Sequence, residues 1–127
     1  MNIGTAILMV LLGLPSPTQA DLQKTAMKET ASQPIHRLVV SFRSECCGTD
    51  RAAIERIDRF IAEFEQAHHS QINFEKSVWG REGEFDYCFD LNQISETVTL
   101  AFITGIYEQA QASRLVNVTE NGTCLRR

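Results

Sequence analysis

The sequence predicts an α+β domain in which two helices cover one side of a four-stranded antiparallel sheet. Residues 37–43, 72–79, 84–91 and 114–119 alternate apolar and polar side chains, with the two-residue period of a strand. Residues 50–68 and 95–112 instead repeat apolar side chains every three or four positions, as amphipathic helices do. The order of elements is therefore strand, helix, strand, strand, helix, strand.

The first strand and the first helix are joined by a loop over residues 44–48. Thr49 is the predicted N-cap of the helix, because a hydroxyl can accept from the free N–H groups of the first turn. His68 and His69 end the helix, where a protonated imidazole stabilises the C-terminus. His36, before the strand, is interpreted as a linker residue. The apolar stripe of this helix consists of Ile54, Ile57, Ile61 and Phe64.

The second and third strands form a hairpin around the glycine-bearing segment 80–83. In the second helix, Gly105 is expected to allow close packing on the sheet. Asn121-Gly122 is a turn signal, which we expect to send the tail back along the fourth strand. The inward face of the third strand is predicted to consist of Phe85, Tyr87, Phe89 and Leu91, and the buried stripe of the second helix of Val98, Ala101, Phe102, Ile106 and Ala110.

This order of elements is typical of the ferredoxin-like, or split βαβ, arrangement. The right-handed crossover rule places both helices on one face of the sheet and makes the first and third strands central neighbours. Many unrelated functions use this fold, so the topology alone does not define one.

The N-terminus has the features of a secretory signal. Residues 1–20 contain no charged side chain, and residues 3–14 form an apolar run that is too short to span a bilayer. Two prolines and the small residue Ala20 follow this run, as expected before a cleavage site. We predict a signal peptide at 1–20, a flexible polar lead-in at 21–35 and a single domain at 36–127, exported to a periplasmic or extracellular compartment.

Composition and motifs exclude several classes of function. The net charge is −4, so the basic footprint of a nucleic-acid-binding protein is absent. No membrane association is expected after signal cleavage, and no spacing typical of a catalytic centre or a cofactor site occurs. The sequence therefore favours a non-enzymatic binding or protein-interaction module, whose partner is an unknown protein or a small polar ligand.

Four cysteines in a small exported domain predict two disulfides. The preferred pairing joins Cys46 or Cys47 to Cys88, because the first and third strands are neighbours. Cys124 is then expected to form the second disulfide with whichever of Cys46 and Cys47 is left.

Cys46 and Cys47 also suggest an alternative function. They lie in the loop before the first helix, whose N-terminus favours thiolate. In position, this loop resembles the metal loop of heavy-metal-associated domains, which share the topology but use Cys-x-x-Cys. The resemblance implies metal binding or thiol-redox chemistry at the pair.

The face of the sheet opposite the helices is the predicted partner face. It should present Glu75, Trp79, Asp86 and Asp90, an acidic surface with one exposed tryptophan. Such a surface is suited to a basic or polar partner. Asn117 and Asn121 each begin an Asn-x-Thr sequence, which is a glycosylation acceptor only in a eukaryotic secretory pathway.

Overall fold

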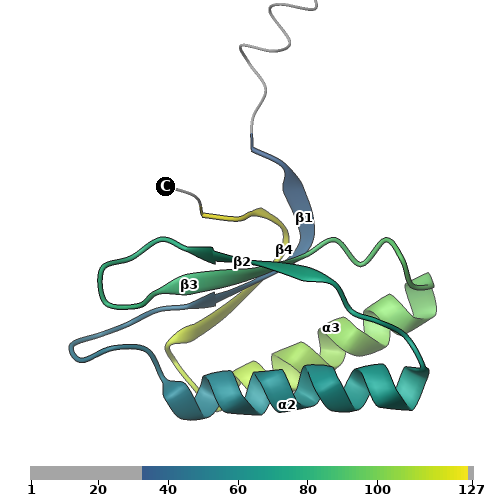
Figure 1. Cartoon of the computed structure of the whole chain (residues 1–127), viewed down its shortest axis with the longest axis horizontal. Coiled ribbons are helices and arrows are strands. Elements are labelled where there is room, and N and C mark those ends of the chain that lie inside the picture. The colour runs from purple at the N-terminus through teal and green to yellow at the C-terminus, as the bar shows by residue number, and fades with distance from the viewer. Residues whose placement is uncertain (1–32, 126–127) are drawn as a thin grey trace, which may run out of the picture. The chain divides into compact units, whose positions relative to one another are not determined.

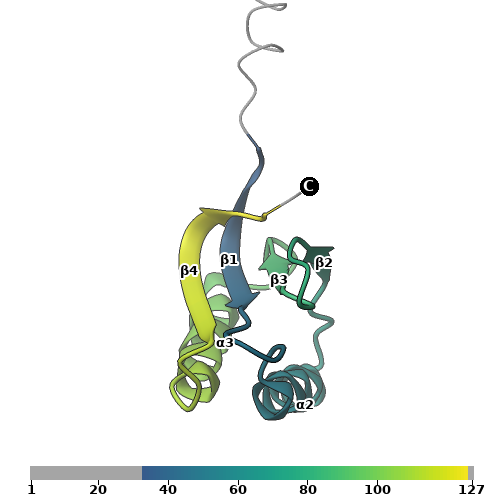
Figure 2. The same ribbon diagram turned by 90° about the vertical axis from the view of Figure 1, so that its left-hand side faces the viewer.

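A computed structural model describes residues 33–125 and confirms the predicted α+β arrangement (Figure 1). The four strands form one antiparallel sheet in the order β2-β3-β1-β4, and both helices lie on one side of it (Figure 2). The predicted signal peptide and most of the lead-in lie outside the described residues. The elements are β1 (Ile35–Phe42), α2 (Arg51–His68), β2 (Phe74–Val78), β3 (Phe85–Phe89), α3 (Glu96–Ala110) and β4 (Val116–Thr123).

The core lies between the sheet and the two helices. Aromatic rings from neighbouring strands meet there: Phe42 stacks on Phe85, with ring centroids 4.6 Å apart. The predicted inward residues of the third strand are all buried, so the alternating pattern assigned this face correctly. No helix within residues 33–125 has the length and apolar character needed to cross a membrane.

The helix ends differ from prediction at one point. Asp50, not Thr49, is the N-cap of α2, because its backbone is extended and its carboxylate accepts from the Ala53 N–H at 3.1 Å. Ser95 caps α3 in the same way, and its hydroxyl accepts from the Val98 N–H. His69 ends α2 in a left-handed conformation with φ 48°.

The buried side of α3 is shifted from the predicted stripe. Ala101 is exposed, whereas Thr99 and Ile103 are buried. Gly105 does serve close packing, but against α2 rather than the sheet, since a Cβ there would lie 2.1 Å from Cζ of Phe60. Two helices packed side by side on the sheet bury part of their flanks against each other, which a single stripe does not describe.

The fourth strand is longer than predicted, and the expected turn at Asn121-Gly122 is wrong. Both residues lie inside β4, whose pairing with β1 extends to Thr123 opposite Ile35. Asn121 takes the left-handed conformation, with φ 52°, without changing the register. The chain turns only after Thr123, and it then crosses the sheet instead of returning along β4 (Figure 2).

Candidate functional site

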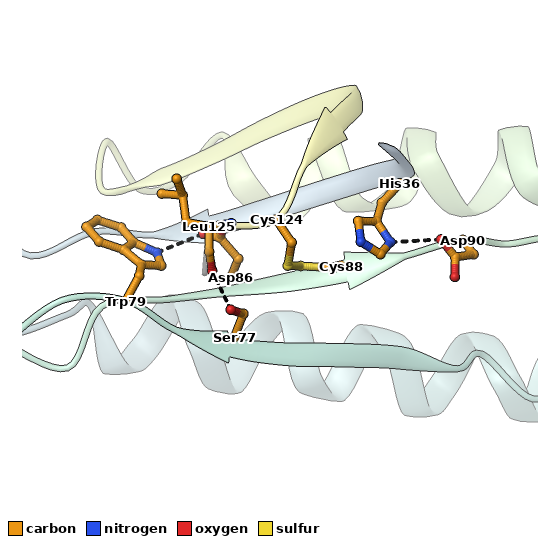
Figure 3. The surroundings of a disulfide bond; sticks show 8 residues. All are labelled: His36, Ser77, Trp79, Asp86, Cys88, Asp90, Cys124 and Leu125. Carbon is orange, nitrogen blue, oxygen red and sulfur yellow. Dashed lines mark hydrogen bonds and ion pairs between the residues drawn. A yellow bond between two sulfur atoms is a disulfide. The ribbon is translucent and has the colours of Figure 1, made fainter. Parts of the chain in front are cut away.

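The sheet face opposite the helices is covered at its centre by the end of the described chain. Cys124 forms a disulfide with Cys88 of β3, with the two Cα atoms 6.0 Å apart. The two cysteines and Val39 of β1 make a small buried cluster, in which no residue is more than 3% exposed. Figure 3 shows this crossing segment, residues 124–125, above strand β3. We call it the tail clamp.

Asp86 is a second attachment point for the tail clamp. Its side chain is fully buried, and both carboxylate oxygens accept hydrogen bonds. The indole N–H of Trp79 donates to Oδ1 at 2.9 Å, and the Leu125 N–H donates to Oδ2 at 2.9 Å. The Ser77 hydroxyl donates to the Leu125 carbonyl, so β2 is attached as well (Figure 3). These donors satisfy the carboxylate, which therefore supports the fold.

The predicted partner face is consequently not one open acidic surface. Asp86 is inside the protein, and Trp79 is half-buried with its N–H engaged, although Glu75 and Asp90 are exposed. Alternation along β3 correctly placed Asp86 on the helix-free side. It gave no sign that the tail covers that side. The prediction that Asp86 is exposed is wrong; the one signal for a buried polar anchor was a carboxylate in an apolar strand, two residues before a cysteine.

His36 lies within β1 and is buried, so its interpretation as a linker residue is wrong. Its Nδ1 atom is 2.8 Å from Oδ1 of Asp90, and Figure 3 shows the pair beyond the disulfide. Asp90 also lines a small pocket of about 70 Å³ with side chains rich in amides. Sites for drug-sized ligands are roughly 300–1,000 Å³, so this pocket suits only a very small polar ligand.

The preferred disulfide pairing is wrong. Cys88 pairs with Cys124, whereas Cys46 and Cys47 are free, exposed thiols. The reason is register: Val39 lies opposite Cys88, and Cys46 lies beyond the end of β1 at Phe42. Neighbouring strands therefore do not bring the loop cysteines to Cys88.

The loop that carries Cys46 and Cys47 has a fixed base and an exposed tip. Ser44 and Thr49 form an antiparallel bridge that closes the loop, and Gly48 takes φ 108° within it. The pKa of Cys46 is raised, mainly by a hydrogen bond with the Cys47 side chain and to a smaller extent by burial. Both thiols are free and exposed at the tip of the loop.

Contacts on both sides hold the base of this loop. The Ser44 hydroxyl donates to Oε1 of Glu84 in the β2–β3 hairpin at 2.5 Å. Glu45 forms an ion pair with Arg114, with Nη2 and Oε2 2.5 Å apart. Hydrogen bonds from Ser113 and the Ala53 N–H lower the pKa of Asp50. The two-cysteine tip therefore extends from an ordered base.

One group of metal-ligating atoms occurs on the helix-free face. Atoms of Asp86, Cys88 and Cys124 lie within 4.8 Å of one another. Both sulfurs are in the disulfide, and both carboxylate oxygens accept hydrogen bonds. The oxidised protein consequently offers no metal ligands at this position.

The outer strand β2 exposes apolar side chains. Phe74 is 39% exposed and Val78 is 59% exposed. Phe74 also forms one wall of an open groove of about 330 Å³ between β2 and α2. Burial and the hydrogen bond to Asp58 raise the pKa of Tyr87 at the base of this groove. The other residues that line the groove are Asp58, Ile61, Ala62 and Glu65.

No protein-family model matches the chain, and searches of curated proteins and of solved structures returned no match. The functional argument therefore depends on the chain's own residues.

Proposed function

We propose that this protein is an exported binding module that adds an extended segment of a partner protein to the outer edge of β2. The observation that carries the proposal is the exposure of Phe74 and Val78 on an edge strand. An edge strand leaves alternate backbone N–H and C=O groups unpaired, and these can bond an incoming strand.

Phe74 and Val78 are positioned to act together as anchors. They lie opposite Phe89 and Phe85 of β3, so both side chains are on the helix side of the sheet. Between them, the Lys76 ammonium lies 4.2 Å from the centre of the Phe85 ring and leaves the two apolar groups accessible. A partner strand would gain main-chain hydrogen bonds from β2 and apolar contacts from these two residues.

The strand at the opposite edge, β4, exposes no large apolar side chain comparable to Phe74 or Val78. The exposed side chains of β4 are polar, and they include Asn117, Thr119 and Glu120. Main-chain pairing along β4 would add little apolar burial, which is the main favourable term in association. This difference favours β2 as the binding edge.

The groove defines the chemistry of the partner. Asp58 and Glu65 lie along its α2 side, and the whole chain carries a net charge of −4. Opposite charge across an interface promotes encounter and fixes register. The partner segment should therefore alternate apolar residues with Lys or Arg.

Export is part of the proposal. The apolar run before Ala20 supports secretion, and the Cys88–Cys124 disulfide is compatible with an oxidising compartment. N-terminal sequencing of protein recovered from the periplasm or the medium should give Asp21 as the first residue. Recovery of an uncleaved chain in the cytoplasm would contradict export.

Peptide selection on the purified protein tests the binding edge. Random extended peptides selected on the protein should be enriched in alternating apolar and basic residues. A Phe74→Ser, Val78→Lys double variant should weaken their binding by roughly tenfold or more, the effect of losing about 1.4 kcal/mol. Asn117→Lys on β4 is the matched edge control and should leave affinity unchanged. Equal binding by the β2 variant and the parent protein would contradict the proposal.

A further inference from the structure

Cys46 and Cys47 are unusual for exposed residues. Cysteine is among the most frequently buried residue types, and a free thiol on the surface of an exported domain is open to oxidation. The same chain buries its other two cysteines in a disulfide. Two adjacent free thiols at an exposed loop tip therefore need an explanation other than packing.

We propose that Cys46 and Cys47 form a dithiol site that captures a thiophilic metalloid of the trivalent arsenic class. The two cysteines are adjacent in the sequence, and both thiols are free and exposed in the same short loop, so one small thiophilic group has access to both sulfur atoms. The Ser44–Thr49 bridge holds the residues on either side of the tip, which lowers the entropy cost of presenting both ligands at once. This site is separate from the β2 edge and does not depend on it.

The number of ligands decides the class of ion. A structural zinc site takes four protein ligands, and catalytic zinc usually takes three. Within residues 33–125, no third cysteine, histidine or carboxylate joins Cys46 and Cys47 in a ligand group. Trivalent arsenic needs only two thiolates, because its third substituent is its own hydroxyl or carbon group. Soft sulfur ligands also select soft ions over Mg²⁺ or Ca²⁺.

The local charges permit this reaction. Glu45 is the nearest acidic residue in the sequence, and its ion pair with Arg114 reduces its repulsion of a developing thiolate. In the capture step both S–H bonds break and two As–S bonds form. With phenylarsine oxide, the arsenic-bound oxygen leaves as one water with the two thiol protons. Arsenic remains trivalent, so no oxidant or reductant is required.

Phenylarsine oxide is the probe for the test, because it bridges paired thiols and binds single thiols weakly. The full-length protein with Cys88–Cys124 intact should bind one equivalent, and its mass should increase by one phenylarsenic group less two hydrogens. Cys46→Ser and Cys47→Ser should each weaken binding by roughly a hundredfold or more, because each variant can form only one As–S bond and loses the gain from two linked bonds. Both positions are exposed, and circular dichroism checks that the variants are folded.

Two controls separate the site from other thiols and from the proposed binding edge. The Phe74→Ser, Val78→Lys variant should bind the arsenical like the parent protein, so either proposal can fail while the other stands. Equal binding by the parent and by either single serine variant would overturn the dithiol site. Isolation of the native protein with Cys46 and Cys47 already cross-linked would also overturn it.

Discussion

The two cysteine pairs of this protein differ in nearly every physical respect. Cys88 and Cys124 are separated by 36 positions, buried, and joined by a disulfide between β3 and the tail clamp. Cys46 and Cys47 are adjacent, exposed and free. A cross-link between distant positions restricts the unfolded chain, whereas one between neighbours closes almost no loop. The first pair therefore stabilises the fold, and the second is available for chemistry.

Removing the buried disulfide should have the largest effect. A Cys88→Ala, Cys124→Ala variant should lose about 2–4 kcal/mol of unfolding free energy, because the unfolded chain regains the entropy of an open loop. Urea denaturation without reductant measures the difference from the parent protein. A loss below about 1 kcal/mol would mean that the tail clamp is held mainly by hydrogen bonds, and the contrast between the pairs would be weaker than proposed.

The buried carboxylate tests whether the tail clamp has support besides the disulfide. Asp86→Asn turns an amide N–H₂ toward either the Trp79 indole or the Leu125 N–H, so one buried donor loses its acceptor. With the disulfide intact, we expect a loss of about 1–3 kcal/mol and faster hydrogen exchange at the Leu125 amide. Unchanged exchange at that amide would show that Asp86 does not hold the tail.

The sequence predicted one face of the sheet much better than the other. Burial on the helix side follows from local periods of two and 3.6 residues, so residues such as Phe42 and Phe89 could be assigned directly. Burial on the opposite side depends on the course of the few residues after β4, and no periodic pattern in the sequence predicts that course. The Asn121-Gly122 pair even suggested the wrong path, because pairing with β1 overrides its turn preference.

The candidate sites were predictable to different degrees. The Cys46–Cys47 loop was located from the order of elements. Its free thiols were expected only under the alternative metal or redox function, whereas the preferred prediction placed both in disulfides, because pairing is a tertiary property. His36 was missed for a similar reason, since its partner Asp90 lies 54 positions away. The β2 groove was also missed, because the exposure of Phe74 on an edge strand is a property of the tertiary structure.

The helix cap beside the dithiol loop should have an intermediate effect. Asp50→Ala should lose about 1 kcal/mol of stability, because the first turn of α2 loses its acceptor. The pKa of Asp50 is lowered in the folded protein, so its ionised form contributes stability above about pH 4, and this contribution falls as the pH decreases further. Asp50→Asn keeps a capping oxygen without the charge. The free energy of unfolding should therefore change less between pH 3 and 7 for Asp50→Asn than for the parent protein. The same pH dependence in both proteins would contradict this role.

The exposed cysteine pair should have the smallest effect on stability, and this completes the comparison. A Cys46→Ser, Cys47→Ser variant should unfold within about 0.5 kcal/mol of the parent protein, because neither side chain is packed against the core. The same variant should lose all rapid alkylation by a thiol reagent, while the buried disulfide of the parent reacts only after reduction and unfolding. Both changes are measured on one sample, by urea denaturation and by mass after alkylation. A loss of 2 kcal/mol or more would assign the loop cysteines a structural role, comparable to that of Cys88 and Cys124, and would remove the reason to consider them a chemical site.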